Sequence, residues 1–400
     1  MKKNKFLVGI MPSIFSVIIG LFIGWFLMLL TNPVDSVSGI FTILKGGFID
    51  GSEGIGRVIY TAIPIIMTGL AVGFSFKTGL FNIGASGQFT VGAFCAILVG
   101  VKLNMLPPFL HCAAAIFAGV LAGALWGTLS GALKAYFRVS EVITGIMLNY
   151  IGMLVVNLLI KTYVYDSTFN RTANVADSAV LKRGFLEWLL PGSGINVGFV
   201  IVIIVVILIK ILLDKTTFGY ELKTIGKNRF AGLYAGINDK KSIVLSMAIS
   251  GALAGLGGAL MYLSDFNDHI VVVDTVLQQG FTGICVALLG MSNPIGVFVS
   301  GLFIAHLTVG GNYLQLYSFT PEIVEMIIAV IIYCSSLTVV IKNFLSERSK
   351  KRLVLKAERW AANEYIIFHC STNHVFCHSS YDSGIGRYVF GAKRSCKYSS

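Results

Sequence analysis

The sequence predicts an all-α protein, a polytopic bundle of about ten membrane-spanning helices. Three observations lead to this fold class. Hydrophobic residues make up 55% of the 400-residue chain, charged residues make up only 12%, and long apolar segments recur along most of its length. A soluble domain carries about twice that charged fraction, because it must cover its surface with charge. The composition therefore excludes a soluble globular protein.

The predicted membrane segments start with a basic stretch that is followed by an apolar run of about 20 residues. A signal peptide would have a shorter apolar run and a small-residue cleavage site, so we expect residues 8–30 to be retained as the first helix. Further runs long enough to cross a bilayer follow at 57–76, 80–100, 109–133, 142–160, 194–213, 241–263, 276–291, 294–311 and 322–342.

The distribution of basic residues predicts that both chain ends lie in the cytoplasm. With the N-terminus inside, the inner connections hold most of the basic residues: Lys2, Lys3, Lys5, Lys77, Lys134, Arg138, Lys215, Lys223, Lys227, Arg229, Lys240, Lys241 and Lys342. The late outer loops instead carry Asp265, Asp268 and Asp274 with no basic residue. We therefore expect a multi-pass protein of the cell membrane, N-in and C-in.

The formal net charge of +12 follows from this topology, because the inner loops face anionic lipid. No basic patch interleaved with aromatic residues indicates nucleic acid as a partner. The seven cysteines show no framework spacing, so structural disulfides are not expected. The membrane region shows neither metal-ligand spacing nor a nucleophile paired with a base, so we expect no catalysis in this chain.

Two stripes of small residues predict close helix packing. In the fourth segment, glycine recurs every four residues, and the seventh segment has a similar stripe. Residues at this spacing share one face of a helix, where a neighbouring backbone can approach closely. The stripes are Gly119, Gly123, Gly127 and Gly131 in the fourth segment, and Gly251, Gly255 and Ala259 in the seventh.

Ionisable residues are scarce within the predicted spans, where each is costly to bury. Glu141 opens the fifth segment, Glu322 and Glu325 open the tenth, and Lys210 lies near the end of the sixth. His306 in the ninth segment is expected to be a buried, hydrogen-bonded histidine. A proton- or sodium-coupled carrier would show more such groups, so energy for transport is expected to enter through another subunit.

Uncharged polar residues, by contrast, are frequent in the third, fifth and eighth segments. Amides and hydroxyls in hydrocarbon must find hydrogen-bonding partners. Two interpretations stay open: these side chains tie helices together, or they line a wet path for a neutral polar solute. The candidate path residues are Asn82, Ser86, Gln88, Glu141, Asn149, Gln279 and Thr282.

The loop over residues 214–241 is the longest predicted inner connection before the tail. Its basic residues lie beside a run of small and apolar residues that predicts a short helix ending at Gly236. Exposed apolar residues with a basic rim indicate a docking surface for a partner protein, and a helix lying on the lipid headgroups is the alternative. The candidate docking residues are Gly226, Asn228, Ala231, Tyr234, Ala235, Gly236 and Ile237.

Ordered blocks of residues carry a resemblance to a known family. They are Lys77-Thr78-Gly79-Leu80-Phe81-Asn82-Ile83-Gly84 with Gly87-Gln88, Ser140-Glu141-Val142-Ile143 through Ile146-Met147-Leu148-Asn149-Tyr150, Gly226 and Asn228 with Tyr234-Ala235-Gly236-Ile237, Gly280-Phe281-Thr282-Gly283-Ile284 with Val286-Ala287-Leu288-Leu289-Gly290, and Asn293-Pro294. Over about residues 5–345 the chain resembles permease subunits of ATP-binding-cassette (ABC) importers for branched-chain amino acids, simple sugars and nucleosides. The nucleoside permeases fit best.

This resemblance implies a type II ABC importer fold in which residues 80–88 lie at the translocation path. The implied partners are ABC ATPase subunits inside, a second permease, identical or homologous, and an extracellular solute-binding lipoprotein. The implied solute is a nucleoside. The alternatives are an ABC permease for a sugar or a branched-chain amino acid, or an ion-coupled secondary carrier. The family usually shows an acid where this chain has Ser86, which leaves the exact substrate open.

Nucleotide binding is not expected in this chain. The phosphate-binding pattern G-x-x-x-x-G-K-[ST] does not occur, since Gly226-Lys227 is followed by Asn228. ATP and Mg²⁺ are therefore expected on the partner ATPase, with no cofactor in the permease itself. The loop at 214–241 is where the motion of that ATPase would be received.

A change of composition after Leu345 divides the chain into a transmembrane permease domain, residues 1–345, and a tail, residues 346–400. The tail holds ten Lys or Arg, three of the six His and three of the seven Cys. Its cluster His369-Cys370, His374 and Cys377-His378 matches no standard zinc-finger spacing, so no metal site is predicted. We expect a basic, Cys- and His-containing, disordered cytoplasmic extension.

Overall fold

The computed structural model describes residues 2–103, 105–184, 188, 194–317, 319–320, 325–326, 329–330 and 333–334. Apart from its loops, this part of the chain is helical, with a single two-stranded antiparallel ribbon of β1 (Tyr165–Asp166) and β2 (Arg171–Thr172). The all-α fold class is therefore confirmed. The tail and most of the expected tenth segment, 322–342, lie outside the described residues.

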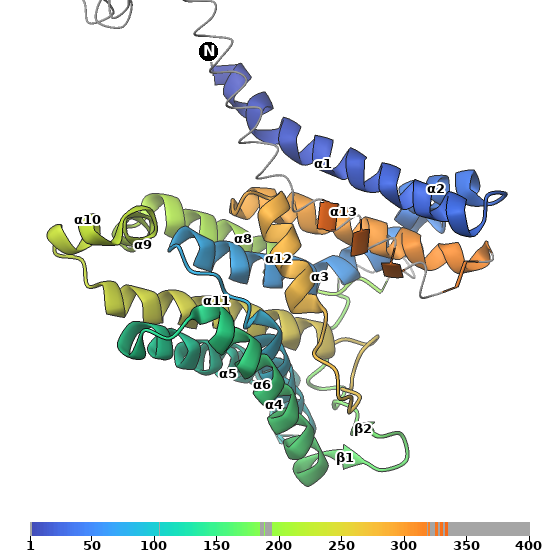
Figure 1. Ribbon diagram of the computed structural model, residues 1–400. Coiled ribbons are helices and arrows are strands. Elements are labelled where there is room, and N and C mark those ends of the chain that lie inside the picture. The colour runs from blue at the N-terminus through green and yellow to red at the C-terminus, as the bar shows by residue number, and fades with distance from the viewer. Residues whose placement is uncertain are drawn as a thin grey trace, which may run out of the picture. The chain divides into compact units, whose positions relative to one another are not determined.

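Long apolar helices form the bundle in Figure 1. Within the described residues, seven helices are long and apolar enough to cross a membrane. They are α1 (Lys2–Thr31), α3 (Gly51–Lys77), α4 (Ala85–Lys102), α5 (Pro108–Phe137), α6 (Glu141–Tyr163), α11 (Asp239–Tyr262) and α13 (Pro294–Asn312), which continues into η2 (Tyr313–Leu316). α8 (Gly198–Lys215) is as long as α4 but has three charged residues near its end. The polytopic bundle is confirmed, and the count of about ten crossings stays a prediction.

The eighth expected segment, 276–291, contains the shorter helix α12 (Gln279–Leu289). Its 11 residues rise about 16 Å, roughly half the thickness of the hydrocarbon layer. The chain then turns back into α13 through Met291 and Ser292, whose φ angles are 54° and 53°. α12 and α13 therefore form a tight helical hairpin.

Several shorter elements escape a search for long apolar runs. They are α2 (Ser36–Lys45), η1 (Gly46–Phe48), α9 (Thr217–Lys227) and α10 (Arg229–Tyr234), of which the sequence predicted only the last. The third expected segment also starts later than predicted. Residues 78–84 form a non-helical turn after α3, and α4 begins at Ala85.

The two predicted stripes of small residues pack against each other. α5 and α11 run side by side (Figure 1), and their backbones meet at the glycines. A Cβ atom added at Gly251 would lie 2.2 Å from the carbonyl oxygen of Gly123, and one at Gly127 would lie 2.3 Å from that of Met247. The predicted close packing is therefore confirmed, and only glycine fits these contacts.

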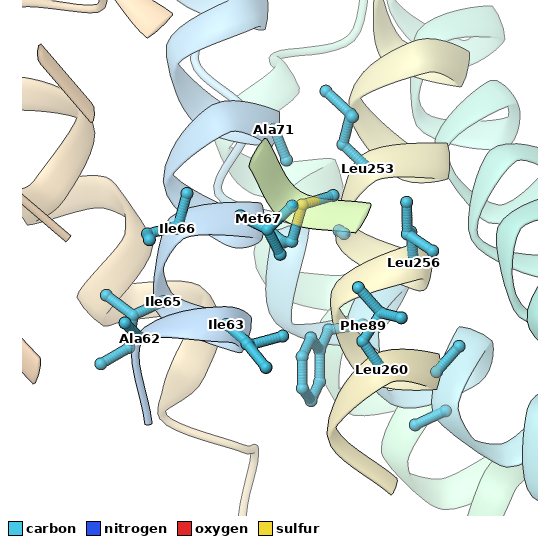
Figure 2. Close-up of a cluster of buried hydrophobic side chains, with 14 of the residues drawn as sticks. Ala62, Ile63, Ile65, Ile66, Met67, Ala71, Phe89, Leu253, Leu256 and Leu260 are labelled. Carbon is cyan, nitrogen blue, oxygen red and sulfur yellow. The ribbon is translucent and has the colours of Figure 1, made fainter. Parts of the chain in front are cut away.

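The apolar core lies between α3, α4 and α11. Ile63 and Met67 of α3, Phe89 of α4 and Leu260 of α11 are fully buried in this cluster (Figure 2). α3 is 27 residues long, which corresponds to about 40 Å and is enough to cross the bilayer. It is therefore long enough for its two ends to lie on opposite sides of the membrane.

Replacing Gly251 with valine should destabilise the bundle, because the added side chain must push α5 away. Overpacking of this kind costs about 1–3 kcal/mol. We expect the melting temperature of the detergent-solubilised Gly251→Val protein to fall by several degrees. The control is Leu125→Val, because Leu125 is 63% exposed on α5. An unchanged melting temperature for Gly251→Val would contradict the close contact.

Candidate functional site

Four of the predicted path residues gather at the start of α4. Asn82 and Gln88 are buried, and the Asn82 amide donates hydrogen bonds to Gln88 Oε1 at 2.8 Å and to Ser250 Oγ at 2.7 Å. The Ser250 hydroxyl in turn donates to the carbonyl oxygen of Ala71 at 2.6 Å. This network joins α3, α4 and α11 across the turn at 78–84.

Asn149 of α6 supports the same turn from another side. Its Nδ2 donates to the carbonyl oxygen of Ile83 at 3.0 Å, and its Oδ1 accepts from the Gly87 N–H at 2.7 Å. The Gly87 N–H is one of the groups that lack a partner within the first turn of α4. The N-cap residue, Gly84, has no side chain to satisfy it. Asn149 therefore caps α4 from a different helix.

Ser86 connects the start of α4 to α12. Its hydroxyl donates to the carbonyl oxygen of Leu277 at 2.7 Å, and a Cβ atom at Gly280 would lie 2.3 Å from Ser86 Oγ. A carboxylate has no proton to donate in this way, so the acid usual in the resembled family could not make the same contact. Ser86 thus has a local structural role in this chain.

Gln279 and Thr282 lie on the first turn of α12, close to Ser86. The Gln279 carbonyl accepts a hydrogen bond from Thr68 Oγ1 of α3 at 3.0 Å. Within the described residues, the buried Gln279 Oε1 has no hydrogen-bonding partner. Thr282 is half-buried, and its hydroxyl donates to the Gln278 carbonyl at 3.3 Å. Gln279 therefore has a buried acceptor that no described residue uses.

Glu141 stands apart from the other predicted path residues. It is paired with Lys134, across the short connection between α5 and α6. The side chains of Asn82, Ser86, Gln88 and Asn149 are all satisfied by protein groups. In this conformation these four tie helices together, and their place along a solute path stays a prediction.

The predicted docking loop consists of two short helices at one end of the bundle (Figure 1). Asn228 separates them, and its Oδ1 accepts hydrogen bonds from the backbone N–H groups of Phe230 at 3.0 Å and Ala231 at 3.2 Å. Asn228 is therefore the N-cap of α10. The helix ends at Tyr234, and Gly236, two residues later, has a φ of +79° and a backbone N–H that donates to the Leu233 carbonyl. The predicted short helix is present, and it ends two residues before the predicted Gly236, which lies just beyond its C-cap.

α10 presents apolar residues outward. Tyr234 is 93% exposed, Phe230 is 73% exposed and Leu233 is 46% exposed. Ala231, Ala235 and Gly236 are also exposed, and Ile237 is half-buried. An exposed cluster of this kind, beside basic residues, is typical of a surface that a partner protein covers.

The docking loop rests on the turn that leads into α4. A Cβ atom at Gly226 would lie 2.3 Å from the carbonyl oxygen of Lys77, so the end of α9 contacts the backbone after α3 directly. Gly79 faces this contact with a φ of +73°, a conformation that glycine adopts readily. Three residues further along the chain is Asn82, which belongs to the buried network.

Sequence reasoning missed the residues of α11 that complete this network. Ser250 binds Asn82, and Ser246 exchanges a hydrogen bond of 2.5 Å with Thr78 of the turn. The signal was a polar stripe, because Ser242, Ser246 and Ser250 recur every four residues beside the glycine stripe. His306, expected to be buried, is half-buried and hydrogen-bonded to the Leu44 carbonyl at 2.9 Å.

Metal-ligating residues do not cluster in the described part of the chain, where no group of three or more His, Cys, Asp or Glu could hold an ion. The His and Cys cluster of the tail lies outside that part.

The chain belongs to the family described as the permease component of the branched-chain amino acid transport system, which its residues 54–336 match. It is 35% identical over 348 residues to the guanosine ABC transporter permease protein NupP of Bacillus subtilis, covering 87% of this chain and 99% of that protein. It is 33% identical over 364 residues to the nucleoside ABC transporter permease protein NupB of Lactococcus lactis, covering 88% and 98%. The glucose ABC transporter permease protein TsgB13 of Haloferax volcanii is 29% identical over 320 residues, covering 75% and 80%. No solved structure matches the chain.

Removing the Asn149 side chain should loosen the start of α4. Asn149→Ala removes the partner of the buried Gly87 N–H and of the half-buried Ile83 carbonyl, and a buried group left unsatisfied costs about 1–3 kcal/mol. We expect a lower melting temperature in detergent and faster hydrogen exchange at residues 83–88. Leu154→Ala, at a 57% exposed position of α6, serves as the control. Equal exchange in the wild type and Asn149→Ala would refute the capping role.

Proposed function

We propose that this chain is the permease subunit of an ATP-driven ABC importer and that its solute is a nucleoside. The family match and the polytopic bundle support the role of a membrane permease. The guanosine and nucleoside permeases resemble this chain over nearly their whole length, at higher identity than the glucose permease does. This difference favours a nucleoside over a sugar.

The observation that carries the proposal is the position of α10. Its exposed Phe230, Leu233 and Tyr234 form a surface for an ATPase subunit, and the adjoining α9 touches the turn before α4 through Gly226. In this proposal ATP and Mg²⁺ bind to the ATPase, which moves α9 and α10. Because Gly226 and Gly79 meet backbone to backbone, the movement is passed to the turn that carries Asn82.

Displacement of this turn would separate α4 from α12 and open a path between them. Breaking the bond from Ser86 to Leu277 would free a hydroxyl for the solute. The unpartnered Oε1 of Gln279 would accept a hydrogen bond from a ribose hydroxyl or a base amine. Asn82, Gln88, Asn149 and Thr282 would supply further polar groups once their present partners move.

The remaining parts of the proposal concern partners and orientation. The docking loop faces the cytoplasm, in keeping with the N-in and C-in arrangement predicted from the basic residues. A solute-binding lipoprotein delivers the nucleoside from outside, and a second permease, identical or homologous, completes the path.

The function is tested by reconstituting the chain into liposomes with its ATPase, its binding protein and any second permease. We expect guanosine uptake that requires ATP inside the vesicles and that excess glucose does not reduce. The control is the chain alone under proton and sodium gradients, for which we expect no uptake. Uphill transport by the isolated chain would show an ion-coupled carrier and overturn the proposal.

Two variants of the docking loop should fail in different ways. Tyr234→Asp removes an aromatic contact and should prevent the ATPase from co-purifying with the permease. Gly226→Val should keep the ATPase bound but uncouple ATP hydrolysis from uptake, because its side chain pushes α9 off the turn at Lys77. Tyr165→Asp, on the β1–β2 ribbon away from this loop, is the control and should preserve both. Normal uptake in Tyr234→Asp and Gly226→Val would remove the docking role from this loop.

A further inference from the structure

A cavity of about 410 Å³ lies at the end of α3 that is remote from the docking loop. Its main lining residues are Arg57, Tyr60 and Thr61 of α3, Phe266 of the loop after α11, and Asn312 and Tyr313 at the end of α13. Its volume lies in the range typical of small-molecule sites.

The position of this cavity follows from the length of α3. Arg57 and Lys77 are 20 residues apart on one helix, which places them about 30 Å apart along its axis. Lys77 contacts the docking loop at Gly226. If that loop faces the cytoplasm, as the proposed function holds, the cavity opens where the solute arrives.

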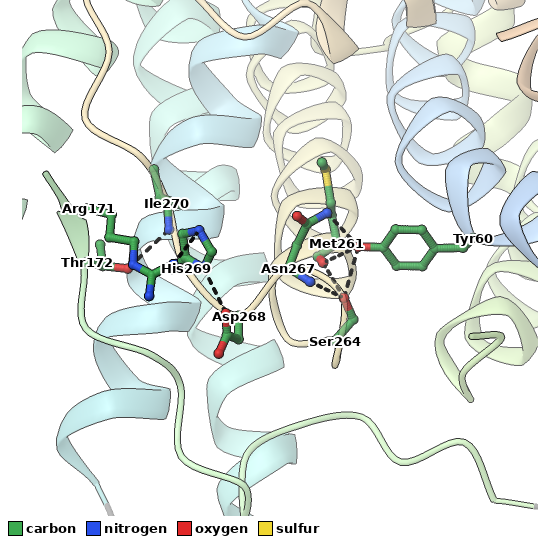
Figure 3. Close-up of polar contacts among 9 residues, drawn as sticks. All are labelled: Tyr60, Arg171, Thr172, Met261, Ser264, Asn267, Asp268, His269 and Ile270. Carbon is green, nitrogen blue, oxygen red and sulfur yellow. Dashed lines mark hydrogen bonds and ion pairs between the residues drawn. The ribbon is translucent and has the colours of Figure 1, made fainter. Parts of the chain in front are cut away.

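Two aromatic rings, of Tyr60 and Phe266, line the cavity. The ring centroids of Tyr60 and Phe266 lie 5.5 Å apart. The Tyr60 hydroxyl is held by Asn267 Nδ2 at 2.8 Å, by Ser264 Oγ at 2.9 Å and by the Met261 carbonyl at 3.0 Å (Figure 3). These hydrogen bonds hold the hydroxyl end of Tyr60, and its ring contributes apolar surface to the cavity.

Polar groups are placed around these rings. Asn312 is exposed and Thr61 is half-buried, and within the described residues neither side chain makes a hydrogen bond to the protein. Asn312 can donate and accept at the same time, which matches the edge of a nucleobase. Arg57 is half-exposed and its Nη2 pairs with Glu53. Because a guanidinium has five N–H donors, other donors of Arg57 stay available at the rim of the cavity.

We propose that this cavity binds the base of the arriving nucleoside, an inference that rests on the proposed function. An aromatic wall stacks on the flat π-face of every base, whereas a free sugar offers only the C–H groups of its ring to such a wall. The Asn312 amide would then read the edge of the base, and Arg57 would bind a ring carbonyl or a ribose hydroxyl. The cavity would thereby select nucleosides over free sugars before the path opens.

The test measures equilibrium binding of radiolabelled guanosine to the permease–ATPase complex in nanodiscs, without the binding protein. Phe266→Leu, which keeps an apolar side chain but removes the ring, should weaken guanosine binding about tenfold. Asn312→Ala should have a similar effect, and Phe266→Trp should retain binding. Gln315→Ala is the matched control, because Gln315 is an exposed amide outside the cavity, in the 3₁₀ helix η2 that directly follows Asn312.

The outcomes separate this inference from the proposed function. Guanosine binding that is absent in the wild type, equal in all variants, or displaced equally well by ribose overturns the inference, even if the complete importer transports guanosine. Failure of the complete wild-type importer to take up any nucleoside overturns the proposed function as well. The base-binding role is supported if guanosine binding is weakened in Phe266→Leu and Asn312→Ala and is retained in Phe266→Trp and Gln315→Ala.

Discussion

Polar groups at the start of α4 must find their partners inside the protein, because hydrocarbon offers none. The chain leaves the helix between α3 and α4, so the turn at 78–84 brings backbone and amide groups into the packed interior. Asn82 joins this turn to Gln88 and Ser250, and Asn149 binds both the turn and the first backbone groups of α4. These bonds fix α3, α4, α6 and α11 around one short segment.

Close backbone contacts make this segment sensitive to its neighbours. Gly145 approaches the turn from α6, where an added Cβ atom would lie 2.8 Å from the Gly84 nitrogen, and Gly226 approaches it from α9. Side chains at these points would act as compressible spacers, since they can change rotamer. Their absence means that a shift of α9 must move the turn or be resisted by the whole network. The packing thus gives a physical basis for coupling between the docking loop and α4.

The sequence was informative where the signal is local. The short helix α10 before Gly236 and the close packing of the glycine stripes follow from residues near one another in the chain. The pairing of the helices cannot be predicted in this way, because contacting residues are far apart in the chain. Ser250, for example, accepts a hydrogen bond from Asn82, 168 positions away. α9 was missed because its buried Leu222 and Ile225 lie on one face of an otherwise polar helix. The length of α12 was overestimated because apolar residues flank it in the sequence. In the structure, Gln278 is the N-cap of the helix, and the chain turns at Met291 just after its end.

α3 runs from the cavity beside Tyr60 to the docking loop, and its backbone hydrogen bonding is interrupted between them. Pro64 has no N–H to donate to the Tyr60 carbonyl, so the helix lacks one of its hydrogen bonds there. One turn later, the Thr68 hydroxyl binds the Pro64 carbonyl at 2.8 Å and the Gln279 carbonyl of α12 at 3.0 Å. A helix bends where its hydrogen bonding is interrupted, so bending of α3 would be centred at this point. Because the same point is tied to α12, a bend that alters the cavity would also move the helix that carries Gln279.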